Sequence, residues 1–268
     1  MYTMLYNKIQ AFTVCCAICA AVTALPCCSA IADDERLIEV KPDIPAQPRR
    51  VLLEAFTGQR CVNCPRGTEV IEQLQQEPGD TTVIAVGIHG GPLAFAGNAR
   101  TVGLATTLGN DYYSHWKLEY QPVGLINRGA PTNYTDWTAA VVGEMAKEVV
   151  LNLSVQSAVE DGHMNISVEA TAIDHDIDAM LQVWVLEDGI TALQLMPDGS
   201  SNASYVHNHV LRAAVNGMWG EEISLQLGCQ QYMTFTQEID PAWNPENIYA
   251  VAFVYTDGDV LQVATGKK

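Results

Sequence analysis

The stretch GQRCVNCPRG, residues 58–67, holds two cysteines whose spacing suits redox chemistry. Two residues separate Cys61 from Cys64, so the sulfurs can bond within a single turn of chain. An apolar run ends just before the pair, and a helical pattern begins at it. A helix N-terminus presents free N–H groups and positive charge, which stabilise a thiolate. We therefore expect Cys61 to be the exposed nucleophile and Cys64, facing inward, to be the resolving thiol.

Other uses of the cysteine pair follow from the same residues. A Cys61–Cys64 disulfide that stays oxidised after export would be a structural staple, and this alternative stays open. A structural zinc site needs four ligands, whereas only Cys229 and scattered histidines accompany the pair. Covalent haem needs His directly after the second cysteine, where Pro65 stands. We expect no metal and no cofactor, and we expect Cys229 to be a small buried residue outside the disulfide.

The elements that must position this pair alternate between strands and helices. The expected strands are VLLEAF (51–56), TTVIAVGIHGG (81–91) and PVGLINR (122–128). A helix is expected after the cysteines and ends at Pro78-Gly79, a second is expected in parts of 97–118 with breaks at Gly103 and Gly109, and a third carries Trp137, Val141 and Met145. This order is that of a thioredoxin-like domain, which we assign to residues 49–147.

Two further positions fit such a domain, and one does not. Pro122 precedes the third strand, where thioredoxin-like proteins carry a cis-proline that binds the substrate chain, so we expect a cis Gln121–Pro122 bond and substrate contact. His89 ends the second strand at the same edge and is expected to border the pocket or to be structural. The acid nearest the cysteines on the first strand is Glu54, and its register is one residue off.

Hydrophobic periodicity changes near Glu148 from helical spacing to strict alternation. VLNLSVQS and MNISVEATAI alternate apolar and polar residues, and Asp161-Gly162 between them is a hairpin signal. Further strands are expected at 179–186, 206–214, 231–239, 248–256 and 260–265, with a hairpin turn at Asp257-Gly258. About seven strands over about 120 residues are typical of an immunoglobulin-like sandwich. The expected fold class is thus a thioredoxin-like α/β domain followed by an all-β, immunoglobulin-like β-sandwich at 148–268.

The N-terminus has the pattern of an export signal. An uncharged apolar run, AFTVCCAICAAVTALP, is too short for a comfortable membrane span and indicates a signal peptide, residues 1–28. Leu25 lies three residues before Cys28, as in the lipobox of bacterial lipoproteins, so we expect lipidation at Cys28, with Cys27 as the fallback. The alternative is plain cleavage after Ala32. Residues 29–48, acidic and then Pro-rich, are expected to be a tether.

The composition excludes one class of partner. The formal net charge is −17, and so acidic a surface would repel phosphate backbones, which argues against a nucleic-acid role. Almost half of the residues are apolar, which is typical of a globular chain with a sizeable core. The partners that remain are protein thiols or disulfides, or a surface ligand, in the cell envelope.

Three strings resemble a known family. LLEAFTGQRCVNCPRG, PVGLINRG and YVHNHVLRAAVNGMWGE are similar to the outer membrane protein 28 family of Bacteroides-type bacteria, over most of the chain after the signal peptide. The resemblance implies a lipidated outer-membrane protein with a thioredoxin-like half, a β-sandwich and a surface or adhesin-like role. The family motif carries over to Cys61, Cys64 and Pro65, to Asn127-Arg128 and to His207-Asn208-His209. It supplies no established catalytic chemistry.

Two hypotheses about function follow. One is a thiol–disulfide oxidoreductase of the cell envelope, or a protein derived from one. The other is a non-catalytic surface-binding lipoprotein whose disulfide is structural. His207 and His209 look like a metal pair, but residues i and i+2 of a strand merely share a face. We therefore expect a packing or hydrogen-bonding role for them.

Overall fold

A computed structural model describes residues 43–76 and 82–267 of the chain. All of these belong to one unit, Lys41–Lys268. The expected signal peptide, the lipidation site at Cys28 or Cys27, the alternative cleavage after Ala32 and most of the tether lie outside the described residues. The expected helix stop at Pro78-Gly79 lies outside them too.

The strand that leads to the cysteines is central in its sheet. Strand β1 (Val51–Thr57) pairs in parallel with β2 (Val83–His89) and antiparallel with β3 (Val123–Ile126), which also pairs with the short β4 (Thr132–Asn133). The helices are α2 (Cys64–Gln76), α3 (Thr107–His115) and α4 (Trp137–Met145), the last preceded by the 3₁₀ turn η2 (Tyr134–Asp136). Side chains cover both faces of β1, because α2 and α4 pack on one face and α3 on the other. That is why β1 carries apolar residues on both faces, with Glu54 as the exception.

One expected helix break is wrong. Gly109 lies inside α3 rather than at its end. The reason is close packing: a Cβ at this position would lie 2.4 Å from the carbonyl oxygen of His89. Gly109 therefore serves the approach of the helix to the end of β2. Glycine at this position is explained by close packing, and it does not end a helix.

The second half consists of strands. They are β5 (Leu151–Glu160), β6 (His163–Ala172), β7 (Ile177–Glu187), β8 (Ile190–Leu195), β9 (Ser201–His207), β10 (Val210–Ala214), β11 (Glu221–Leu225), β12 (Gln230–Glu238), β13 (Ile248–Thr256) and β14 (Asp259–Thr265). Asp161 and Gly162 both have positive φ, as a tight hairpin turn requires. The sequence missed β8, β11 and most of β9. The strand expected at 206–214 is broken, because His209 has a φ of 57°.

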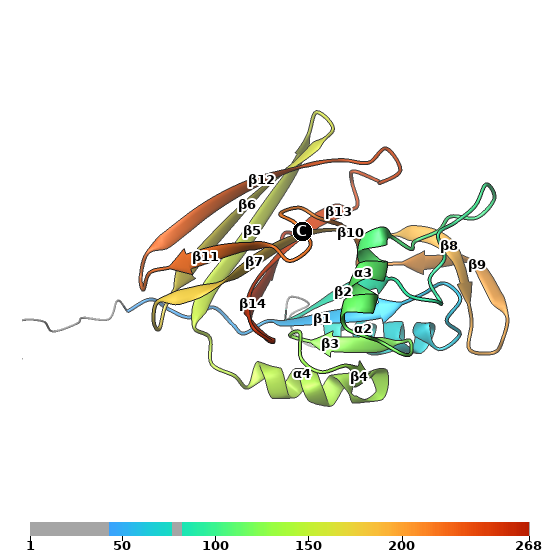
Figure 1. Ribbon diagram of the computed structural model, residues 1–268, viewed down its shortest axis with the longest axis horizontal. Coiled ribbons are helices and arrows are strands. Elements are labelled where there is room, and N and C mark those ends of the chain that lie inside the picture. Colours follow the sequence, from blue (N-terminus) through green and yellow to red (C-terminus); the bar gives the residue numbers. More distant parts are fainter. Residues whose placement is uncertain (1–42, 77–81, 268) are drawn as a thin grey trace, which may run out of the picture. The chain divides into compact units, whose positions relative to one another are not determined.

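One sheet continues across both halves of the chain. Its order is β14-β13-β7-β10-β2-β1-β3-β4, with β11 pairing with β7, so β10 joins β2 to the strands of the second half. Strands β12, β6 and β5 form a second sheet, and Figure 1 shows it as a layer of its own. The fold is thus mostly β, with several sheets and few helices. Residue 148 marks a change in strand pattern, and the main sheet does not end there.

The core also joins the halves. A buried cluster contains Leu52, Val86 and Tyr112 from the first half together with Trp184 and Phe253 from the second. The indole Nε1 of Trp184 donates a hydrogen bond of 3.2 Å to the hydroxyl of Tyr112. A second cluster fills the space between the main sheet and the three-stranded sheet. Burial of this kind couples the two halves energetically.

The end of the expected tether is attached to the fold. The side chain of Asn152 on β5 accepts a hydrogen bond from the backbone N–H of Gln47 and donates one to the carbonyl of Pro45. The side chain of Arg49 donates to the carbonyls of Val260 and Leu261 on β14. The last residues of the expected tether, 45–48, are therefore held against the fold.

Candidate functional site

Cys61 and Cys64 form a disulfide, with their Cα atoms 5.3 Å apart. The backbone N–H of Cys61 donates to the carbonyl of Gly58, and that of Cys64 donates to the carbonyl of Cys61. These turns bring the chain from β1 to the first residue of α2. The expected intramolecular disulfide is confirmed. Cys229 is free, as expected, but it is exposed, so the expectation of a buried residue is wrong.

Neither cysteine of the pair is accessible in this oxidised form. Cys61 is 2% exposed and Cys64 is 3% exposed, so the expectation that Cys61 is the exposed member is wrong. Segment 91–104 packs on one side of the loop: the backbone N–H of Arg60 donates to the carbonyl of Leu93, and its guanidinium lies 4.7 Å from the ring of Phe95. Strand β8 binds the same loop through Gln194.

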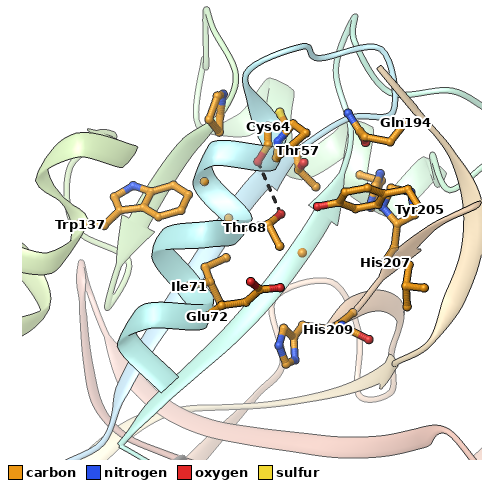
Figure 2. A pocket seen from close by; sticks show the side chains of 18 residues that line it. Thr57, Cys64, Thr68, Ile71, Glu72, Trp137, Gln194, Tyr205, His207 and His209 are labelled. Atoms are coloured by element: carbon orange, nitrogen blue, oxygen red, sulfur yellow. Dashed lines mark hydrogen bonds between the residues drawn. The ribbon is translucent and has the colours of Figure 1, made fainter. Parts of the chain in front are cut away.

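A narrow pocket lies beside Cys64, between α2 and the hairpin β8–β9 (Figure 2). Helix α2 contributes Cys64, Thr68 and Ile71, and the hairpin contributes Gln194, Tyr205 and His207. Its cavity volume is about 60 Å³. That space holds a few water molecules, so a larger ligand requires the walls to move.

Pro122 also lines this pocket. The Gln121–Pro122 bond is cis. Gly67 of α2 lies against the proline ring, because a Cβ at Gly67 would be 3.3 Å from the Cβ of Pro122. The side chain of Gln121 fixes the loop by donating to the carbonyls of Thr57 and Gly90. Contact between Pro122 and a substrate stays a prediction.

Two buried histidines meet in the pocket. The rings of His89 and His207 are 5.4 Å apart in an edge-to-face arrangement, and each lines the cavity. Burial lowers the pKa of His89 well below its usual value and lowers the pKa of His207 to about 4, so both are neutral at pH 7. Nδ1 of His89 and Nε2 of His207 have no hydrogen-bond partner among the described residues.

The other two residues of the His207-Asn208-His209 motif form hydrogen bonds with separate partners. The side-chain oxygen of Asn208 accepts from the backbone N–H of Gly189. Nδ1 of His209 lies 3.0 Å from the hydroxyl of Tyr249, and its backbone N–H donates to Asp188. Within the described residues, no group of three or more His, Cys, Asp or Glu side chains is arranged to hold a metal ion.

Glu54 lies on the other face of β1 from the pocket. Ala55 lines the pocket, and alternation along the strand therefore points Glu54 into the core shared by the two halves. Its carboxylate is 3.7 Å from Nε of Arg128. Burial raises the pKa of Glu54 to about 7, and the charge of Arg128 opposes that shift. The one-residue offset in the sequence thus places this acid away from the disulfide.

The Asn127-Arg128 motif is explained by the same core. The side-chain oxygen of Asn127 accepts from the backbone N–H of Leu52, and its amide nitrogen donates to Glu144. The guanidinium of Arg128 lies over the rings of Tyr255 and Phe253, at 4.0 and 4.7 Å. Both motif residues therefore connect β3 to neighbouring elements, and neither lines the pocket.

Sequence reasoning missed the contribution of β8 and β9. Gln194 and Tyr205 line the pocket, yet neither stands in a pattern that indicates a site. Only the YVHNHV string pointed to this region, and it did so as a family motif. The contact is made between residues more than a hundred positions apart, for which a single sequence carries no local signal.

Comparison with known proteins gives one family. The model of the family described as outer membrane protein Omp28 matches residues 109–267. A search of curated proteins found no match. No helix within the described ranges has the length and apolar character that crossing a membrane requires.

The solved structures that are similar to this chain include the following two. HBP35 of Porphyromonas gingivalis has a TM-score of 0.65 at 12% identity, over 82% of this chain and 75% of its own, and it therefore shares the fold. A domain of the outer membrane lipoprotein Omp28 from Porphyromonas gingivalis is 26% identical, over 44% of this chain and 88% of that domain, with a TM-score of 0.33.

Proposed function

The chain belongs to the family of outer membrane protein Omp28, and from this premise we propose that it is a lipid-anchored envelope protein whose Cys61–Cys64 disulfide exchanges with protein thiols. The observation that carries the exchange is the position of the disulfide. It joins the end of β1 to the first residue of α2, beside a pocket that also contains Pro122. A helix N-terminus stabilises the thiolate that exchange requires.

The reaction is a two-electron exchange with a partner dithiol. A thiolate of the partner attacks one sulfur of the pair, the S–S bond breaks, and the other cysteine leaves as a thiolate that takes up a proton. The partner's second thiol loses its proton and attacks the mixed disulfide. The partner ends as a disulfide, and Cys61 and Cys64 end as two thiols. We assign Cys61 the role of the nucleophile in the reverse direction, because Arg60 is its neighbour and Cys64 begins the helix.

We also propose that residues 49–147 are thioredoxin-like and that the strands after residue 148 derive from an immunoglobulin-like sandwich. The order β1–α2–β2–α3–β3–α4 supports the first assignment. The packing of the three-stranded sheet on the main sheet supports the second. The shared sheet then makes the two parts a joint unit, in which the second half can act on the disulfide of the first.

An insulin-reduction assay tests the exchange. We expect the mature chain to accelerate the reduction of insulin by dithiothreitol, and a Cys61→Ser, Cys64→Ser double variant to give only the uncatalysed rate. Cys64→Ser alone should form a mixed disulfide with a disulfide-bearing substrate, because the Cys61 thiolate attacks the substrate's S–S bond and one substrate sulfur leaves as a thiolate, whereas Cys61→Ser should not. Equal rates for the wild type and the double variant would contradict the exchange role.

A second candidate function is favoured by the burial of the pair. Cys61 and Cys64 are 2% and 3% exposed, which suits a structural disulfide in a non-catalytic, surface-binding protein. That candidate predicts no acceleration of insulin reduction. It also predicts that reduction of the disulfide lowers the melting temperature, because the cross-link stabilises the fold.

The lipid anchor rests on the sequence LPCC before an acidic segment. We propose that Cys28, or Cys27, carries the lipid. Mass spectrometry of the mature N-terminus tests this, and the expected result is a diacylated or triacylated cysteine. An unmodified N-terminus at Asp33 would show plain cleavage.

A further inference from the structure

Strand β8 holds the loop that carries the disulfide. Nε2 of Gln194 lies 2.9 Å from the carbonyl oxygen of Cys61 and 3.3 Å from that of Gly58. The backbone N–H of Leu195 donates to the carbonyl of Gln59 at 2.9 Å. The side chain of Gln59, 0% exposed, donates in return to the carbonyl of Leu193. Main-chain and side-chain bonds thus tie the hairpin to the residues just before Cys61.

The hairpin β8–β9 is joined to no other strand of the described residues. Its two strands form a sheet of their own, with no strand partner among the described residues, while β7 and β10 on either side belong to the main sheet. Most of β9 is exposed. An isolated two-stranded hairpin is marginally stable by itself. Its docking therefore depends on the contacts with the disulfide loop and the pocket, and elements of this kind open locally.

The docked hairpin closes the approach to the sulfurs. Tyr205 and His207 of β9 line the same pocket as Cys64 (Figure 2), and Val206 between them lines it too. With a cavity volume of about 60 Å³, the pocket has no room for the chain segment that carries a protein thiol. Exchange requires the attacking sulfur to reach a sulfur of the pair. Access on this side is therefore possible only when the hairpin leaves the loop.

We propose that the hairpin β8–β9 is a displaceable cover on the Cys61–Cys64 disulfide, and that Gln194 is the positioning residue that latches it. This inference deepens the proposed function, and the biological use of the cover rests on that function. The cover itself rests only on the contacts between the hairpin and the disulfide loop. A partner with an extended segment gains access by replacing β8 at the loop carbonyls. The disulfide is thereby protected from small thiols that do not displace the hairpin.

The rate of disulfide reduction by dithiothreitol in the full mature chain tests the cover. Alkylation after quenching, followed by mass spectrometry, counts two more labels in the reduced form than in the oxidised form, in which Cys229 is already free. Gln194→Ala removes the bonds to the Cys61 and Gly58 carbonyls, and we expect reduction to become about tenfold faster. Gln194→Glu, of the same size, places a carboxylate against these carbonyls and should give at least the same acceleration.

Two control variants separate the hairpin from segment 91–104, which contacts the same loop. Thr191→Ala changes an exposed side chain of β8 itself, and we expect the wild-type rate. Phe95→Ala loosens segment 91–104, where Arg60 packs. If Phe95→Ala accelerates reduction and Gln194→Ala does not, the cover is that segment and the proposal is wrong.

The denaturant dependence distinguishes local opening from global unfolding. Hairpin opening exposes little surface, so the reduction rate should hardly change at low urea concentrations. A steep dependence, equal to that of global unfolding, would overturn the proposal. The rate of reduction by dithiothreitol reports on the cover whether or not the protein exchanges disulfides physiologically. A fast Gln194→Ala variant together with a negative insulin assay would keep the cover and reject the redox function.

Discussion

At the scale of residues, Glu54 and Arg128 form an ion pair buried in the shared core, at 0% and 3% exposure of their side chains. Neither oxygen of Glu54 accepts a hydrogen bond from a described residue. Burial raises the pKa of this carboxyl from 4.5 to about 7 despite the nearby guanidinium. Between those two values the native state holds a proton that the unfolded state releases. The contribution of Glu54 to stability is therefore full below pH 4.5 and is lost as the pH rises through 7.

The variant Glu54→Gln tests this linkage, because it keeps the size of the side chain and removes its titration. Leaving Arg128 unpaired costs a similar free energy at every pH. The difference in the free energy of unfolding between the variant and the wild type should therefore change with pH only through the titration of Glu54. We expect the free energy of unfolding of the variant, relative to the wild type, to rise by on the order of 3 kcal/mol between pH 4.5 and pH 8. Urea unfolding at four pH values measures it. An offset that does not vary with pH would contradict the assignment.

At the scale of elements, two helical glycines have opposite roles. Gly109 of α3 faces the end of β2, and a Cβ there would lie 2.4 Å from the carbonyl oxygen of His89. Gly143 of α4 is exposed, and a Cβ there would meet no atom within 4 Å. Glycine thus permits close packing of α3 at position 109, whereas at position 143 it only lowers the helix propensity of α4.

Alanine substitutions of these two glycines form a matched pair. Gly109→Ala should lower the free energy of unfolding by about 1–3 kcal/mol, because backbone must shift to accept the methyl group. Gly143→Ala should raise it by about 1 kcal/mol, because alanine is the better helix former at an exposed position. Urea denaturation of both variants checks the signs. Equal effects in the two helices would show that helix propensity, and not packing, governs Gly109.

At the scale of the whole molecule, the main sheet and its core make the halves depend on each other. Strand β10 pairs with both β2 and β7. Trp184, 0% exposed, packs in a cluster with Leu52 and Tyr112 of the first half. Separating the halves would expose these side chains to water, which is costly for large apolar groups.

We therefore expect residues 43–267 to unfold in one cooperative transition. Far-ultraviolet and near-ultraviolet circular dichroism should give the same midpoint, which is the test of two-state behaviour. Trp184→Ala should lower the free energy of unfolding by about 3–5 kcal/mol without splitting the transition. Two separate midpoints, or a well-folded fragment of residues 148–268, would show that the halves are independent domains.

The positions of most strands and helices were predictable because their signals are local. The apolar run at β1, the alternation in β5 and β6 and the Asp161-Gly162 turn each act over a few residues. The disulfide was predictable for the same reason, since a spacing of two residues closes within one turn. The one-residue offset that turns Glu54 away from the disulfide was also predictable, because alternation along a strand assigns each side chain to a face.

Only the tertiary structure decided which segments surround those elements. The bond between Gln194 and the carbonyl of Cys61 joins residues 133 positions apart, and the pairing of β10 with β2 is similarly remote. The burial of Cys61, the exposure of Cys229 and the meeting of His89 with His207 depend on such contacts. Periodicity in one sequence records which face of an element is buried but not which element buries it. The sequence by itself determined a cysteine pair at the start of a helix, and the long-range packing decided that a hairpin covers it.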